Sequence, residues 1–121
     1  GKTKEYFMLE NIGHDGYQAG LDYLIGGNDN TSGIAIWHID ENQSGNSDYT
    51  HKLVDLEEAA DAGLDLGAHN GKQTSLFFSG NKTEFSNSTN PNSKTYSGTS
   101  SGITINNISA AGDSMTFDVS F

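Results

Sequence analysis

The chain has 121 residues, no cysteine and a formal net charge of −10, from 16 acidic and 6 basic residues. The lack of cysteine excludes a disulfide framework, a thiolate zinc site and a cysteine nucleophile. The negative charge disfavours nucleic acid and anionic membrane surfaces as partners. A chain of this length accommodates one domain, which we expect to span residues 1–121, and its apolar runs are too short to insert into a bilayer.

Short apolar runs separated by turn residues predict an all-β fold. Glu5–Glu10 (EYFMLE) is nearly continuous and suits a strand buried on both faces. A glycine-rich stretch with a weak apolar island at residues 21–25 follows. Ile34–Ile39 (IAIWHI) has no strand breaker and is the clearest strand, and His51–Leu56 and Ser75–Phe78 are two more. Such strands favour a β-sandwich, with a jelly-roll-like or Greek-key order left open.

The remaining elements are a helical turn and a terminal hairpin. Glutamates and alanines before Gly63 favour one short helical turn near residues 57–63. Gly102–Ile108 and Ser114–Phe121 flank a turn, and the second of them alternates apolar and polar residues, which predicts one buried and one wet face. We expect the core to be formed by Ile34, Ile36, Trp37, Phe117 and Val119.

A polar loop after the clearest strand has the spacing of a cation site. Asp40, Asn42 and Ser44 place oxygen ligands at alternate positions, and Asp48 falls at the ninth position. The twelfth position is His51, where an EF-hand requires a bidentate Glu, so a looser structural Ca²⁺ site is expected instead. Acidic residues that follow in the chain complete the predicted ligand set: Asp55, Glu57, Glu58 and Asp61. The alternatives are an Asx-turn loop and a solvated acidic face.

His38 shares a strand face with the apolar residues before it, which predicts a buried imidazole. A core histidine satisfied by a carbonyl group is favoured over a transition-metal ligand. No nucleophile elbow and no suitably separated carboxylate pair is present, so no catalytic residue is assigned.

Several blocks resemble the region downstream of the catalytic centre in secreted M6 metallopeptidases, the immune inhibitor A family. Glu5–Asn11 (EYFMLEN) resembles the EYFLLEN block, although Ile12 and Gly13 stand where Arg-Gln is usual. Gly33–Glu41 (GIAIWHIDE) resembles the GLLIWHIDE block, and His51–Ala59 resembles H-x-x-V-D-L-E-E-A, with an extra alanine before Asp61. The end of the chain is also similar, at Phe78–Asn81, Pro91–Ser93, Tyr96–Gly98, Ser101–Ile103 and Met115–Phe117.

The resemblance implies a non-catalytic accessory domain of a secreted bacterial zinc peptidase. Members of that family carry zinc on an HExxH helix, whereas no two of the four histidines here are four residues apart. Zn²⁺ is therefore expected only in the catalytic domain of the same polypeptide, which is the expected partner. The chain alone should not hydrolyse peptides.

The second hypothesis is a free-standing module that binds carbohydrate or another extracellular surface. Such modules are small β-sandwiches that stack sugars on exposed aromatic rings. Tyr49 and Tyr96 lie in predicted loops and are the candidate ligand-binding residues.

Overall fold

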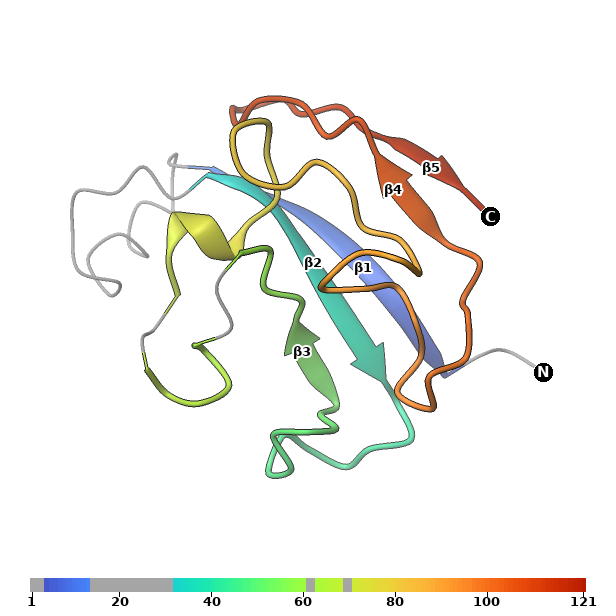
Figure 1. Ribbon diagram of the computed structural model, residues 1–121. Helices are drawn as coiled ribbons and strands as arrows, with labels where there is room; N and C mark the ends of the chain where they lie inside the picture. The colour runs from blue at the N-terminus through green and yellow to red at the C-terminus, as the bar shows by residue number, and fades with distance from the viewer. Residues whose placement is uncertain (1–3, 14–31, 61–62, 69–70) are drawn as a thin grey trace.

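The computed structural model describes residues 4–13, 32–60, 63–68 and 71–121, which form two antiparallel sheets (Figure 1). The larger sheet has the order β1 (Glu5–Ile12), β2 (Gly33–Asp40), β3 (Val54–Leu56). The smaller sheet pairs β4 (Thr104–Asn106) with β5 (Asp118–Ser120). The predicted all-β class is confirmed. Within each sheet the neighbours are consecutive in sequence, so the described strands form a meander and a terminal hairpin.

The register of the larger sheet decides which side chains share a face. β2 is central, and its His38 lies opposite Phe7 of β1 and Asp55 of β3. Because opposed residues of an antiparallel pair point to the same side, Phe7, Leu9, Ile34 and Ile36 share one face with His38. This inner face contacts the rest of the molecule.

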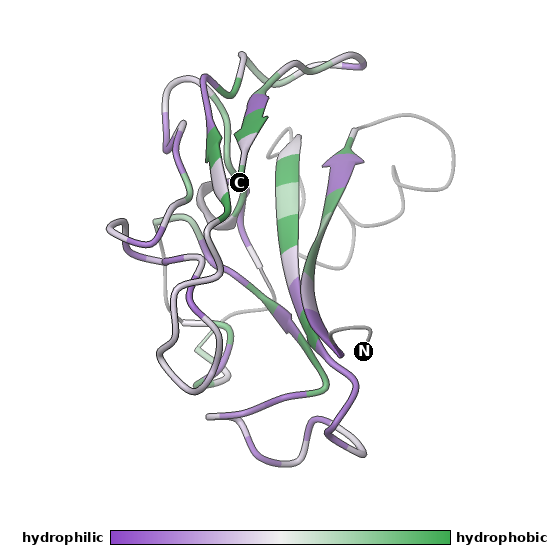
Figure 2. Cartoon of the chain, turned by 90° about the vertical axis from the view of Figure 1, so that its right-hand side faces the viewer, coloured by the Kyte–Doolittle hydropathy of each residue, from purple (hydrophilic) through white to green (hydrophobic). Residues whose placement is uncertain are grey.

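The chain crosses from one sheet to the other through the segment between β3 and β4. Phe77 forms a bridge with Ile34 and so extends the larger sheet, and Phe85 forms a bridge with Ile105 of the smaller sheet. Figure 2 shows the C-terminal hairpin on one side and the strands of the larger sheet on the other. The two sheets therefore enclose one core, and its buried members are Ile34, Ile36, Ala59, Phe77, Phe85, Ile105 and Ile108.

A close approach at the start of β2 requires glycine. Gly33 has φ +152°, and a Cβ built there would lie 2.9 Å from Cβ of Leu76 and 3.1 Å from the carbonyl oxygen of Phe77. A real Cβ does not tolerate such a distance, so any larger residue would push the strand away from the crossing segment.

The core prediction was correct for Ile34 and Ile36 and wrong for the C-terminal strand. Phe117 and Val119 are 37% and 45% exposed. Val119 lies opposite the buried Ile105 and so shares its side of the smaller sheet, but the core covers Ile105 on β4 and leaves β5 largely exposed. Trp37 is half-buried rather than buried, since it lies on the outer side of the larger sheet. The two-residue period identified the C-terminal strand, but it did not say how much of that strand the core would cover.

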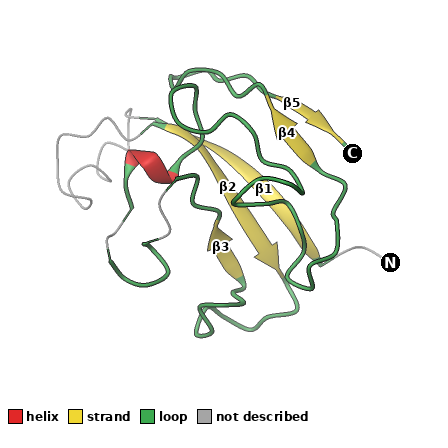
Figure 3. Cartoon of the chain, in the orientation of Figure 1, coloured by secondary structure: helices red, strands yellow, loops and turns green. Residues whose placement is uncertain are grey.

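Other sequence predictions also need correction. The described part of residues 57–63 is not helical, and one 3₁₀ turn lies instead at Gln73–Ser75 (Figure 3). β1 is not buried on both faces, because Met8 is 53% exposed. The strand expected at Ser75–Phe78 is reduced to the bridge at Phe77. The apolar island at residues 21–25 lies outside the described residues.

Candidate functional site

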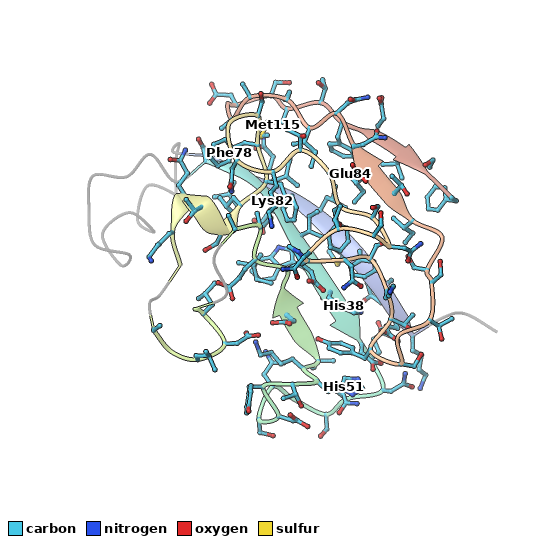
Figure 4. All side chains as sticks on the ribbon, in the orientation of Figure 1. His38, His51, Phe78, Lys82, Glu84 and Met115 are labelled. Atoms are coloured by element: carbon cyan, nitrogen blue, oxygen red, sulfur yellow. The ribbon has the colours of Figure 1, made fainter. Side chains whose placement is uncertain are left out.

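The inner face of β2 changes from apolar to polar towards the end of the strand. Ile34 and Ile36 are followed at the same spacing by His38 and Asp40, each only 3% exposed. Figure 4 shows His38 and His51 at one end of the larger sheet and Met115 near the other. Because a buried ionisable group is tolerated only when it is paired, the partners of His38 and Asp40 define the candidate site.

His38 is held between two carboxylates. Its Nδ1 lies 3.0 Å from Oε1 of Glu57, and its Nε2 lies 2.9 Å from Oε1 of Glu5. A neutral imidazole has only one N–H, whereas an imidazolium donates from both nitrogens and satisfies both carboxylates. Burial opposes that charge, but the hydrogen bonds and charges of Glu57 and Glu5 outweigh burial and raise the pKa of His38 above 6.5.

Tyr96 ties the C-terminal half of the chain to this pair. Its backbone N–H donates to Oε1 of Glu5 at 2.6 Å. Its ring lies parallel to His38, with centroids 4.3 Å apart at 10°, and close to His51, at 4.1 Å and 30°. Two imidazoles this near one ring centroid would overlap on the same face, so they cover opposite faces. Phe7 continues the column on the far side of His38, at 4.4 Å.

The hydroxyl of Tyr96 is buried and has no hydrogen-bond partner. The backbone of Lys52 lies near enough to affect this group, but not in hydrogen-bonding geometry. Burial, reinforced by the negative charge of Asp55, raises the pKa of Tyr96 far above its ordinary value. Tyr96 is therefore a neutral phenol that is held by its ring contacts with His38 and His51 and by its backbone bond to Glu5.

Asp40 is the second buried ion of the site. Its Oδ2 lies 2.7 Å from Nε2 of His51, and its Oδ1 accepts hydrogen bonds from the backbone and side chain of Asn42 at 2.9 and 2.7 Å. Burial alone would raise the pKa of Asp40, but the bonds from Asn42 and His51 lower it below 3.8. The carboxylate is thus ionised and held by protein groups.

The predicted calcium-loop residues do not converge on one point. Asp40 and Asp48 each accept a hydrogen bond from the backbone N–H two residues later, which is the Asx-turn alternative. Asp48 also accepts the hydroxyl of Thr50 at 2.7 Å, and Thr50 is the main cause of its lowered pKa. The side chains of Asn42 and Ser44 are exposed.

The second group of predicted ligands is distributed among other partners. Asp55 accepts a hydrogen bond from Nζ of Lys52 at 2.6 Å, and the same ammonium bonds Asp65. Glu57 is occupied by His38, and Oε1 of Glu58 accepts the backbone N–H of Leu64 at 3.2 Å. Asp61 lies outside the described residues.

These acidic residues nevertheless border a cleft of about 240 Å³. The side chains that line it include those of Asp55, Glu57, Glu58 and Asp65, together with that of Lys82. Within the described ranges, no three His, Asp or Glu side chains are arranged to hold one metal ion. An ion at the first loop would compete with His51 for Asp40, and an ion at the cleft would compete with Lys52 for Asp55.

The two tyrosines of the second hypothesis lie in different surroundings. Tyr49 is 59% exposed in the loop before β3. Tyr96 has an imidazole on each face, which leaves no face of its ring for a sugar. Of the two predicted ligand-binding residues, only Tyr49 is placed to stack on a glycan.

Sequence reasoning missed the roles of Glu5 and His51. Glu5 lies 33 residues from His38, so no local spacing reveals the contact. A usable signal was the placement of ionisable residues at the ends of two apolar strands, on the face that the apolar residues mark as buried. His38 was correctly predicted to be buried, but carboxylates, and not a carbonyl, satisfy it.

Comparisons of the chain with protein-family models, curated proteins and solved structures find no match. Among the described residues, no helix has the length and apolar character needed to cross a membrane.

Proposed function

We propose that this chain is a non-catalytic accessory domain of a secreted M6-type zinc metallopeptidase, which supports the catalytic domain of the same polypeptide. One observation carries the proposal: the polar residues of the blocks that resemble the family meet in a single buried network. Glu5 comes from the first block, His38 and Asp40 from the second, Glu57 from the third and Tyr96 from the last. Hydrogen bonds join His38 to Glu5 and Glu57, and Glu5 to Tyr96. Asp40 bonds His51, whose ring stacks on Tyr96, so it is connected to the same network. A set of groups that satisfy one another is expected of a scaffold.

The close approach at Gly33 supports the same proposal. Gly33 opens the second block, and the segment that would collide with a larger residue ends at the start of the last block, at Phe78. The contacts of His38 with Glu57 and Glu5 join residues of different blocks that are 19 and 33 positions apart, and these contacts hold the strands together.

The test compares the intact gene product with the isolated chain. The proposal expects the isolated chain to show no turnover of casein, with or without added zinc. It expects the intact product to contain an HExxH segment, and a His38→Gln change there to lower the melting temperature of the catalytic region. Casein turnover by the isolated chain, or an intact product with no zinc motif, would contradict the proposal.

Calcium remains a prediction of the sequence. An ion that binds only the folded chain stabilises it by about 2.7 kcal/mol at a hundred times its dissociation constant. Melting the chain in excess EDTA, and again after calcium is added back, measures this effect. An Asp40→Asn variant is the matched control, because it removes the first proposed ligand. The carboxylates of Asp40, Asp55 and Glu57 already have protein partners, so the scaffold proposal does not depend on a bound ion.

A glycan-binding module is the second candidate, and the exposed ring of Tyr49 is the observation that favours it. Retention of the chain on insoluble polysaccharides tests this function. Loss of retention in Tyr49→Ala, with an unchanged melting temperature, would support it. Absence of retention by the unmodified chain would reject it.

A further inference from the structure

The side of the larger sheet turned away from the core carries apolar residues where a two-layer fold expects polar ones. Two rows of register partners cross all three strands. One row joins Met8, Trp37 and Leu56, and the other joins Tyr6, Ile39 and Val54. We call these six residues the outer face. A contiguous apolar surface of this kind is a mark of a protein contact.

Exposure is concentrated at the two edges of the outer face. Met8 of β1 is 53% exposed and Val54 of β3 is 37% exposed, while Trp37 between them is half-buried and Ile39 is only 9% exposed. A partner would therefore contact the outer face mainly along its two edges. Trp, Tyr and Met are the residue types enriched at protein interfaces. Methionine also adapts its shape to a partner, because its side chain is flexible.

Two acidic side chains are tied to the outer face among the residues that the structure describes. Trp37 donates its indole N–H to Oε2 of Glu10 at 3.0 Å, and Tyr6 donates its hydroxyl to Oε1 of Glu41 at 3.0 Å. Both carboxylates therefore sit beside the aromatic rings and are held there. A partner that matches this surface needs an apolar centre and basic groups around it.

We propose that the outer face docks onto a protein surface with an apolar centre and a basic rim, and, resting on the proposed function, that the catalytic region of the same polypeptide carries this surface. A second copy of the chain is a poorer match. Two outer faces would bring Glu10 and Glu41 of each copy together, between chains of net charge −10.

The chain offers a clean labelling test because it contains no cysteine. Met8→Cys and Val54→Cys are made singly, both in the isolated chain and in the intact gene product, and the rate of maleimide labelling is measured by peptide mass. Val119→Cys on β5 is the matched control, since Val119 is similarly exposed at 45% and lies on the other sheet. Melting temperatures of the isolated variants show that each one folds.

Labelling at positions 8 and 54 is expected to be about tenfold slower in the intact product than in the isolated chain. In the intact product, the reagent would reach these positions only when the contact opens locally. Labelling at position 119 should not change. A Glu41→Lys change should restore fast labelling at position 54, because the new charge repels a basic rim. Equal labelling at positions 8 and 54 in the two forms would overturn the docking face, and no effect of Glu41→Lys would overturn the basic rim.

Failure of the proposed function gives a different result. If the intact product has no zinc-binding catalytic region, both the proposed accessory function and the proposed partner are rejected, whatever the labelling rates. Protection in the isolated chain that grows with protein concentration, and is lost in Met8→Glu, would show that the occupant is a second copy, contrary to the proposal. Protection in the intact product alone, with the catalytic region present, supports both.

Discussion

The two ends of the inner face of the larger sheet are buried to a similar degree but stabilised in different ways. At one end Ile34 and Ile36 pack with Phe77 and Phe85, whose rings meet edge to face at 5.9 Å. At the other end, two residues further along the same strand, His38 is enclosed by carboxylates and aromatic rings.

The comparison shows that burying an apolar side chain and burying an ionisable one to the same degree have different effects on the free energy of folding. The apolar end gains free energy from area removed from water, which is independent of pH and tolerant of which apolar residue is used. The polar end is stable only when every charge has its partner and each group has one protonation state. The apolar end therefore supplies stability, and the polar end fixes which strands and loops meet.

The largest effect is expected from Phe85→Ala at the apolar end. Phe85 is fully buried, and removing such a ring costs about 3–5 kcal/mol because a cavity remains. Urea unfolding of the variant measures the loss, which should be equal at pH 6 and pH 8. Phe121→Ala is the control, since Phe121 is 95% exposed and its removal should change stability by less than about 0.5 kcal/mol. Equal losses in the two variants would contradict the assigned core.

The next effect is expected from His38→Gln at the polar end. Glutamine retains one donor group but not the charge, so Glu5 and Glu57 would face each other without a cation. The expected cost at pH 6 is about 2–3 kcal/mol, somewhat below that of a fully buried pair, because both carboxylates are slightly exposed. His51→Gln should cost less, since His51 is 36% exposed. The reverse order in urea unfolding would contradict the central role of His38.

A smaller loss is expected from Asp40→Asn. The change removes a charge-assisted bond to His51 and costs about 1–2 kcal/mol at neutral pH. The pKa of Asp40 is lowered on folding, so its contribution is present above pH 3.8 and is lost as the pH falls through the folded value. Acid titration of both proteins by circular dichroism should therefore show curves that converge at low pH. A constant difference down to the lowest pH would show that the charge of Asp40 is not the cause.

The smallest effect, and the only gain, is expected from Tyr96→Phe. The substitution keeps the ring contacts with both imidazoles and removes a buried hydroxyl that has no partner. The variant should be as stable as the original chain or more stable, by up to about 1 kcal/mol. A loss of similar size in thermal melts would indicate that the hydroxyl makes a hydrogen bond.

The apolar end was partly predictable from sequence, because IAIWHI has an unambiguous strand pattern and two of its residues are in the core. Phe77 and Phe85 could not be identified as core residues from sequence, since they lie outside regular strands. Single bridges to Ile34 and Ile105 attach them to the two sheets, and they pack in the core between the sheets. The hairpin was identified, but alternation alone cannot tell how far the core extends over β5, and Phe117 and Val119 are exposed although Val119 lies opposite the buried Ile105.

The polar end was less predictable, for a physical reason. The contacts of His38 and Glu5 join residues that are 19 to 91 positions apart, such as His38 with Glu57 and Glu5 with Tyr96. Local spacing placed Asp40 in a loop with the pattern of a cation site, and the protein partners that hold it come from the tertiary fold. The Asx turn at Asp40 was the part of this site that local sequence could predict.

The measurement that tests the polar end most directly is the free energy of unfolding from pH 5 to pH 9, for the original chain and for His38→Gln. The pKa of His38 is raised on folding, so its contribution is complete below pH 6.5 and is lost as the pH rises through the folded value. We predict a difference between the two proteins that is constant at low pH and shrinks at high pH. A difference that is independent of pH would contradict an imidazolium held between Glu5 and Glu57.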